Sequence, residues 1–109
     1  MKLIRSVIHP DKVEHVKAAL GKLDVSWLTL TQVCDHNPRT PHTMTWRGHK
    51  FDVGAMRTEI DVAVHDDAVD QVVAVIIRTA RTGDTEDGYV SVMPVECRYD
   101  IRTGCQAVS

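Results

Sequence analysis

A turn rich in glycine and hydroxyl side chains is the first stretch of the sequence that is equipped to bind a ligand. It runs from Thr82 to Gly88, between a helical pattern that ends near Ala80 and a strand pattern that begins at Tyr89. Its glycines leave backbone N–H groups free of side-chain cover, so several of them can converge on one anion. Turns with glycine also join helices to strands where no ligand binds. The spacing by itself therefore leaves an anion site and an ordinary turn both open.

The other side chains that do chemistry form no recognisable motif. The six histidines include no helical i,i+4 pair with an acid between them, as a zinc protease site requires. His36 and His42 flank a loop and are the pair most able to meet. Catalytic triads assemble in space and cannot be argued from the order of residues along the chain. The sequence therefore predicts no metal site and no enzyme.

The three cysteines contain no CxxC pair, which argues against a metal-binding motif. Cys97 and Cys105 bracket one short segment, so a disulfide between them would fix that segment and make it sensitive to redox state. In a reducing cytosol free thiols are the commoner state. The sequence leaves both states of this pair open.

Length and composition favour a single cytoplasmic domain, residues 1–109. The chain has 109 residues and a net charge of −2, which suffices for one core and gives no general attraction to nucleic acid. The longest apolar run, Val72–Ile77, is too short to cross a membrane. The N-terminus lacks the apolar region of a signal peptide, so we expect the protein in the cytoplasm.

Alternation and helical spacing predict the elements that position the turn. Strands are expected at 2–9, 27–33, 59–64 and 89–93, and helices at 12–23 and 66–80. Asp11 is expected to cap the first helix in a capping box with Glu14, and a short extra strand is expected at 98–103. The order is that of an α+β, ferredoxin-like βαββαβ fold. One face of its sheet would have no helical cover, which favours self-association.

The segment 36–55 shows no clean periodicity, because Pro38 and Pro41 interrupt it. A long irregular loop in a small domain is typically a binding element or disordered. This loop carries both cations and apolar groups, namely Arg39, Arg47, Lys50, Met44, Trp46 and Phe51. A solvated linker needs no such apolar groups, so we expect a flexible target-binding loop, with an incidental insertion as the alternative.

Several short motifs occur in a characteristic order along the chain. The most specific are Ile76-Ile77-Arg78-Thr79-Ala80-x-Thr82-Gly83 and Ile101-Arg102-Thr103-Gly104; the others are Met1-Lys2-x-Ile4, Pro10-x-Lys12, Leu28-Thr29-Leu30-Thr31-x-Val33, His42-Thr43, Arg47-Gly48 and Asp87-Gly88. In these motifs the chain resembles the PII signal-transduction family. The resemblance implies a homotrimer of ferredoxin-like subunits, a loop that reaches target proteins, and an adenine nucleotide in the cleft between neighbouring subunits.

The resemblance also implies roles for individual residues. Val7 and Thr29 would lie by the adenine, Asp61 would contact the ribose, and the turn at 82–89 would hold the phosphates together with Arg102. The nucleotide site implied in this way comprises Val7, Thr29, Asp35, Asp61, Gly83, Asp87, Gly88, Tyr89, Arg98 and Arg102. Arg39 and Arg47 are assigned to a small anion or effector.

Three positions depart from the family pattern in ways that bear on the ligand. Tyr89 replaces the usual Lys after Asp-Gly, Glu86 replaces the usual Gly before it, and Asp100 replaces the first Arg of Arg-x-Arg. On a strand, Asp100 would share a face with Arg98 and Arg102. Fewer cations and more carboxylates weaken the binding of a triphosphate most. We therefore predict that ADP or AMP binds better than ATP.

The loop departs from the family pattern as well. Phe51 replaces the Tyr that many members uridylylate, and His49 replaces a Ser that others phosphorylate. Arg39 stands where a Gln helps to hold magnesium and 2-oxoglutarate, and it suits a smaller anion held by charge-assisted hydrogen bonds. These features resemble the carboxysome-associated PII-like proteins, which bind adenine nucleotides with bicarbonate and are linked to inorganic-carbon uptake. The alternative is a nitrogen-regulatory PII protein with an altered ATP/2-oxoglutarate site, acting on an ammonium transporter or a nitrogen-assimilation enzyme.

Overall fold

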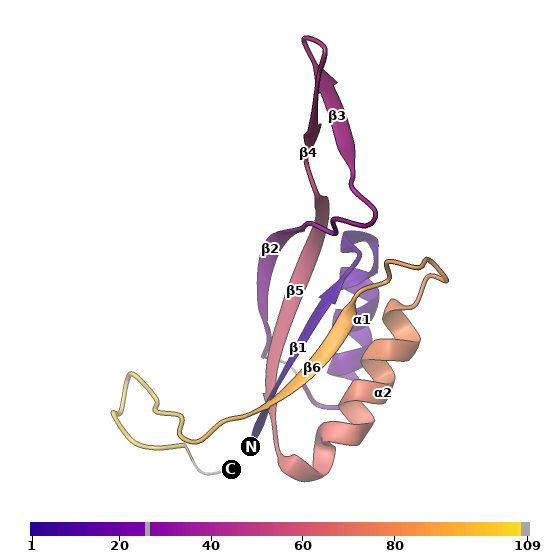
Figure 1. The fold of residues 1–109 in the computed structure, drawn as a ribbon. Helices are drawn as coiled ribbons and strands as arrows, with labels where there is room; N and C mark the ends of the chain where they lie inside the picture. The colour runs from indigo at the N-terminus through magenta and orange to yellow at the C-terminus, as the bar shows by residue number, and fades with distance from the viewer. Residues whose placement is uncertain (26, 108–109) are drawn as a thin grey trace.

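The computed structural model describes residues 1–25 and 27–107, and its elements follow the predicted order with a hairpin where a loop was expected (Figure 1). They are β1 (Lys2–Ile8), η1 (Pro10–Lys12), α1 (Val13–Gly21), β2 (Thr29–Asp35), β3 (Thr43–Trp46), β4 (His49–Asp52), β5 (Ala55–Val64), η2 (Asp66–Ala68), α2 (Val69–Ala80) and β6 (Tyr89–Pro94). The predicted α+β class is confirmed. That residues 1–109 form a single domain stays a prediction.

The four long strands form one antiparallel sheet in the order β2-β5-β1-β6. With the two helices as crossovers, this is the ferredoxin-like arrangement that the sequence predicts. The register places Thr29 of β2 opposite Asp61 of β5, and Val7 of β1 opposite Tyr89 of β6. Residues that are far apart in the sequence are thus paired across adjacent strands of one sheet.

Both helices pack against one face of the sheet, and the core lies between these two layers (Figure 1). Alternation along β5 buries every second side chain, Ile60, Val62 and Val64, as the pattern predicts. The helices contribute the apolar positions that recur at helical spacing. The buried core cluster is Ile4, Ile8, Val16, Leu20, Ile60, Val62, Val64, Val72, Ile76 and Ala80.

The other face of the sheet carries an ion cluster instead of a helix. The Arg5 guanidinium donates two hydrogen bonds to the Asp61 carboxylate, at 3.0 and 3.1 Å, and its Nε lies 3.3 Å from Glu59. The hydrogen bond that Arg5 donates to Asp61, followed by the charges of Asp61 and Glu59, raises the pKa of Arg5 above its ordinary value. Asp61 is therefore engaged within its own subunit.

Both helices begin differently from the prediction. Each is preceded by a 3-10 turn, and Asp11 lies inside the first of these, with no side-chain hydrogen bond to cap the helix. The fixed φ of Pro10 suits the first position of such a turn, so no carboxylate cap is needed there. Glu14, expected to complete a capping box, contacts Lys17 at 3.3 Å instead.

Half of the segment expected to be irregular, residues 43–52, forms the hairpin β3–β4, which projects beyond the sheet (Figure 1). Arg47 and Gly48 have φ values of +49° and +78°, so both residues of the two-residue turn are left-handed, as in a type I′ hairpin. Met44 pairs with Phe51 and Trp46 with His49, whereas Thr45 and Lys50 lie on the opposite face. The hairpin therefore has an apolar, aromatic face that is exposed to solvent.

The predicted C-terminal strand at 98–103 is wrong for the part of the chain that is described. The chain turns at Asp100, whose carbonyl accepts the Gly104 N–H at 2.8 Å and whose carboxylate accepts the Thr103 N–H at 3.0 Å. A single bridge, Tyr99 to Gln106, joins the two limbs. Asp100 thus stabilises a turn, and Arg98 and Arg102 do not share the face of a strand.

The hairpin and the C-terminal segment give the molecule an extended outline (Figure 1). The radius of gyration is 16.8 Å, against about 13 Å for a compact chain of this length. Ile101 at the end of the C-terminal segment is fully exposed. Among the described residues, no helix is long and apolar enough to cross a membrane.

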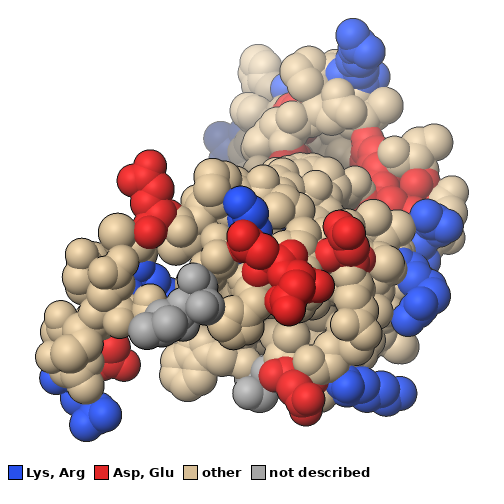
Figure 2. Space-filling model, turned by 90° about the horizontal axis from the view of Figure 1, so that it is seen from below, with Lys and Arg blue, Asp and Glu red and all other residues tan. Residues whose placement is uncertain are grey.

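Acidic side chains gather at the end of the molecule where α2 begins (Figure 2). Asp66 and Asp67 lie in the first turn of η2, and Asp70 follows in α2, where the partial positive charge of a helix N-terminus favours carboxylates. The Met1 amine lies 2.8 Å from Asp66 Oδ1 and holds the pKa of that carboxyl below its ordinary value. The helix N-terminus and the Met1 amine therefore account for the carboxylates at this end of the molecule.

Candidate functional site

The turn between α2 and β6 is folded around the carboxylate of Asp87. The N–H groups of Thr82 and Gly83 both donate to Asp87 Oδ2 at 3.0 Å, and the Thr82 hydroxyl donates to Oδ1. The amides expected to converge on a free anion therefore converge on an anion from the chain itself. An external phosphate has to bind outside this ring of donors or displace Asp87.

The pKa of Asp87 is held below its ordinary value of 3.8, first by the Thr82 hydroxyl and then by the two N–H groups. A carboxylate whose folded pKa is depressed stabilises the fold above its unfolded pKa, and this contribution is lost as pH falls through the folded pKa. We expect Asp87→Asn to be less stable than wild type at pH 7 and to lose less further stability between pH 4 and pH 2.

Urea unfolding followed at pH 7, 4, 3 and 2 tests this expectation. Asp11→Asn is the matched control, because it removes a carboxylate that makes no capping hydrogen bond in the described structure. Parallel pH profiles for Asp87→Asn and wild type would contradict the role given to Asp87.

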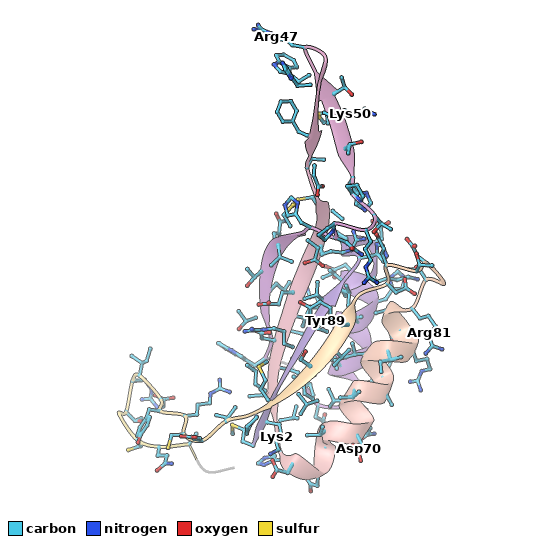
Figure 3. The ribbon with its side chains drawn as sticks, viewed as in Figure 1. Lys2, Arg47, Lys50, Asp70, Arg81 and Tyr89 are labelled. Carbon is cyan, nitrogen blue, oxygen red and sulfur yellow. The ribbon has the colours of Figure 1, made fainter. Side chains whose placement is uncertain are left out.

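Gly88 fixes the turn against β1. Its φ is +109°, and a Cβ built there would lie 1.9 Å from the carbonyl oxygen of Val7. Val7 is buried, and its register partner Tyr89 is half exposed at the start of β6, where Figure 3 labels it. Of the predicted nucleotide residues, Val7, Asp87, Gly88 and Tyr89 are therefore brought together. Gly83 lies at the outer end of the same turn with open space around it.

Glu86 joins this turn to the base of the hairpin. Its carboxylate accepts a hydrogen bond from the Thr40 hydroxyl, and its Oε2 lies 2.9 Å from His42 Nε2 and 3.8 Å from the Arg57 guanidinium. The Thr40 hydroxyl, ahead of His42, lowers the pKa of Glu86 below its ordinary value. The carboxylate is therefore charged at neutral pH and connects three segments.

A cavity of about 220 Å³ lies beside this connection. Arg57, Glu86, Gly88 and Tyr89 line it, together with Asp35 from the end of β2. It thus unites the turn before β6 with one predicted residue from another strand, and it contains both a cation and a carboxylate. An anion in this cavity would compete with Glu86 for Arg57.

The remaining predicted residues form a second group toward the opposite end of the sheet. Thr29, Asp61 and Arg98 line a cavity of about 370 Å³, and Arg102 lies further out, beside Trp27 and Tyr99. The cavity linings of the first and second groups share no residue. Within one chain the predicted nucleotide residues therefore fall into two separate groups.

The two arginines assigned to an effector do not meet. Arg39 precedes β3 at the base of the hairpin, where its N–H is bonded to Asn37. Arg47 lies at the tip (Figure 3), with its guanidinium 5.5 Å from the Trp46 ring. The length of β3 separates them, so a shared anion site within one subunit is not formed.

Three of the six histidines, His9, His36 and His42, lie against carboxylates. His42 contacts Glu86 and His36 contacts Asp52, so the two do not come together as the sequence allowed. His9 Nε2 is buried, and it lies 3.5 Å from Asp87 Oδ1. Residues 1–25 and 27–107 contain no cluster of three side chains suited to a metal ion. Cys97 and Cys105 are free thiols, so the disulfide considered from the sequence is not formed.

The most informative residue that the sequence analysis did not assign to the site is Arg57. It lies on β5 in alternation with Glu59 and Asp61, on the open face of the sheet. From that alternation, Arg57 could have been predicted to be a cation on the same face of the sheet as the site. Thr40 and His42 gave no such signal, because their contact with Glu86 spans more than forty residues of sequence.

The fold and the site define a class of protein: a small ferredoxin-like sheet domain with a projecting hairpin joined to a glycine-containing turn. A family model described as nitrogen regulatory protein P-II matches residues 1–105. The chain belongs to this P-II family.

Individual relatives agree over almost the whole chain. Nitrogen regulatory protein GlnK of Escherichia coli K12 is 34% identical over 105 residues, which is 95% of this chain and 94% of the relative. Nitrogen regulatory protein P-II of Haemophilus influenzae and nitrogen regulatory protein P-II 1 of Escherichia coli K12 are 36% and 37% identical with the same coverage. All three names refer to nitrogen regulation. They favour the nitrogen-regulatory alternative over the carboxysome-associated interpretation, for which the comparisons give no support.

Proposed function

We propose that this protein is a P-II regulator of nitrogen metabolism that binds an adenine nucleotide and signals its presence through the β3–β4 hairpin. The observation that carries the proposal is the Glu86 connection, which ties the phosphate turn directly to Thr40 and His42 at the hairpin base. A ligand shifts a conformational equilibrium only when it binds one state better than the other. A phosphate that draws Arg57 away from Glu86 would favour a state with a freer hairpin.

The hairpin has the chemistry expected of a target-binding element. Its exposed apolar face presents Met44, Trp46 and Phe51, none of which packs into the core cluster. Aromatic side chains and arginine are enriched at protein interfaces. The target we propose is a protein such as an ammonium transporter or a nitrogen-assimilation enzyme. The predicted cytoplasmic location fits such a target.

We further propose that the complete nucleotide site lies between subunits. The phosphate turn and the group of Thr29, Asp61 and Arg98 are separate half-sites within one chain, and the C-terminal segment extends away from its own sheet (Figure 1). Both features suit a cleft that neighbouring copies complete in a homotrimer. Equilibrium sedimentation at micromolar concentration would give a monomer if this part of the proposal is wrong.

The ligand order that we propose is ADP or AMP ahead of ATP. Glu86 already occupies the neighbourhood of Arg57, and Tyr89 supplies no charge at the turn. Each further phosphate therefore adds repulsion that no described cation on the turn offsets. Bicarbonate and 2-oxoglutarate are the effectors to compare, because they distinguish the carbon and nitrogen interpretations.

Calorimetry with AMP, ADP and ATP, each with and without bicarbonate and 2-oxoglutarate, tests the function. We expect Glu86→Gln to tighten ATP binding about threefold, the scale of one exposed ion pair, and to affect AMP least. The control is Glu14→Gln, which removes a carboxylate paired with Lys17 on α1. Failure of all three adenylates to bind would overturn the function, and an ATP affinity ten times higher than that of ADP would overturn the ligand order.

The coupling to the hairpin has its own measurement. The chain has two tryptophans, so Trp27→Phe leaves Trp46 as the only indole. We expect nucleotide addition to change Trp46 fluorescence in this background, and Glu86→Gln to reduce the change. A Trp46 signal that does not respond to a bound nucleotide would contradict the connection through Glu86.

A further inference from the structure

A cysteine, a histidine and an aspartate come together at the base of the hairpin, on the side away from Glu86. Cys34 Sγ lies 3.7 Å from His36 Nε2, and His36 Nδ1 lies 3.5 Å from Asp52 Oδ2. The two imidazole nitrogens therefore face a thiol and a carboxylate. None of the roles described so far uses this group.

The hairpin base holds these three side chains in place. Gly54 N–H donates to Asp52 Oδ1 at 2.9 Å, and this bond is the main reason that the pKa of Asp52 lies below its ordinary value. A Cβ at Gly54, whose φ is +69°, would lie 2.6 Å from Cys34 Sγ and 2.9 Å from His36 Cε1. Glycine at this position allows the thiol and the imidazole to approach the β4–β5 connection.

We propose that Cys34 is a reactive thiol, modified by hydrogen peroxide and other soft electrophiles, with His36 as its base and Asp52 positioning the imidazole. Cys34 is exposed, as a modification site must be. An imidazole oriented by a carboxylate is a standard means of producing a thiolate. The sulfur also lies 3.2 Å from the uncharged Val53 carbonyl, and the register partner of Cys34 on β5 is the uncharged Met56. The Asp35 side chain alternates to the other face of β2.

The proposed reaction with peroxide is balanced. At rest the thiol donates to the Val53 carbonyl. In the reactive state its proton moves to His36 Nε2, and the thiolate sulfur attacks one peroxide oxygen. The S–O bond forms as the O–O bond breaks, and the departing hydroxide takes the proton from His36 to leave as water. Sulfur is oxidised and peroxide reduced by two electrons, giving a sulfenic acid. Because Gly54 lies against the sulfur, the added oxygen should disturb the hairpin base.

The other two cysteines of the chain are internal controls. Cys97 and Cys105 are exposed thiols that contact Gln106 and Thr103, and no imidazole lies against either of them in the described part of the chain. With limiting iodoacetamide at pH 6, we expect Cys34 to be alkylated about fivefold faster than either, because only Cys34 has an imidazole placed to take its proton as the sulfur reacts. Mass spectrometry of the peptides gives all three rates in one experiment.

Variants separate the proposed roles. His36→Gln should bring the Cys34 rate to that of Cys97 and remove the low-pH limb of its pH–rate profile, and Asp52→Asn should slow it partly. His15→Gln, an exposed histidine on α1, is the matched control. Peroxide followed by dimedone should label Cys34 first. Equal rates at the three cysteines, a Cys34 rate unaffected by His36→Gln, or dimedone labelling without preference for Cys34 would each overturn the proposal. Circular dichroism of each variant confirms that it is folded.

Discussion

Replacing Gly88 with alanine is expected to be the most damaging single-methyl change in this chain. The φ of +109° at this residue is one that side chains rarely adopt, and the added carbon would lie 1.9 Å from the Val7 carbonyl oxygen. Backbone strain alone costs about 1–3 kcal/mol, and here β1 or the turn must also move apart. We expect a loss of at least about 3 kcal/mol in the free energy of unfolding, together with loss of nucleotide binding.

Gly83→Ala is the matched control for this prediction. Gly83 lies in the same turn with φ +90°, yet no atom lies within 4 Å of the position of its Cβ. Gly83→Ala should therefore lose only about 1 kcal/mol in the free energy of unfolding, the cost of a strained backbone without a steric clash. Urea unfolding at one fixed protein concentration compares the two, since association would make stability depend on concentration. Equal losses for Gly88→Ala and Gly83→Ala would show that the contact with Val7 has no effect.

The second large effect is expected from Ile60→Ala. Ile60 is fully buried at the centre of β5, between Ser6 of β1 and Leu30 of β2. Truncating a buried isoleucine removes its apolar contacts and leaves a cavity in a close-packed core, which costs about 2–5 kcal/mol. For a domain of this size the thermal midpoint should fall by roughly 10 °C or more.

An exposed isoleucine provides the comparison. Ile101 lies at the outer end of the C-terminal segment and is fully exposed, so Ile101→Ala makes the same chemical change outside the core. Its effect on unfolding should stay within about 0.5 kcal/mol. A thermal midpoint for Ile60→Ala within a degree or two of wild type would contradict the packing described for β5.

The helices and long strands could be predicted because their patterns are local. Ile60, Val62 and Val64 recur at every second position of β5, and the apolar positions of α2 recur at helical spacing. Each pattern reflects burial against the same core, so sequence and tertiary structure agree. The ferredoxin-like order then follows from the sequence of elements.

The hairpin was missed because its turn lacks the usual residues. Arg47 at φ +49° occupies a position that Asn, Asp or Gly normally takes in a two-residue turn. A short C-terminal strand was expected at 98–103, but hydrogen bonds from Thr103 and Gly104 to Asp100 favour a turn there. At the hairpin tip the pairing of β3 with β4 prevails over the backbone preference of Arg47, whereas at Asp100 local hydrogen bonds decide the conformation.

The site itself was predictable only in part. The motif around Thr82 and Gly83 located the turn, but no pattern of residues indicates that Asp87 fills its ring of donors. The identity of Glu86 was recognised as unusual, whereas its partners became evident only in the structure. Contacts between residues far apart in sequence depend on the register of the sheet, which single positions do not reveal.

Because the hairpin projects away from the core, a protease could cleave the chain at the hairpin tip and leave the packed core intact. Trypsin cleaves after arginine, and Arg47 lies in the exposed two-residue turn at the tip (Figure 3). The N-terminal piece would keep β1, α1 and β2, and the C-terminal piece β5, α2 and β6. Since β5 pairs with both β1 and β2, and β6 pairs with β1, the two pieces interleave strand by strand. Such a nicked molecule would stay assembled, and two separately made halves have the complementary edges needed to reconstitute the sheet.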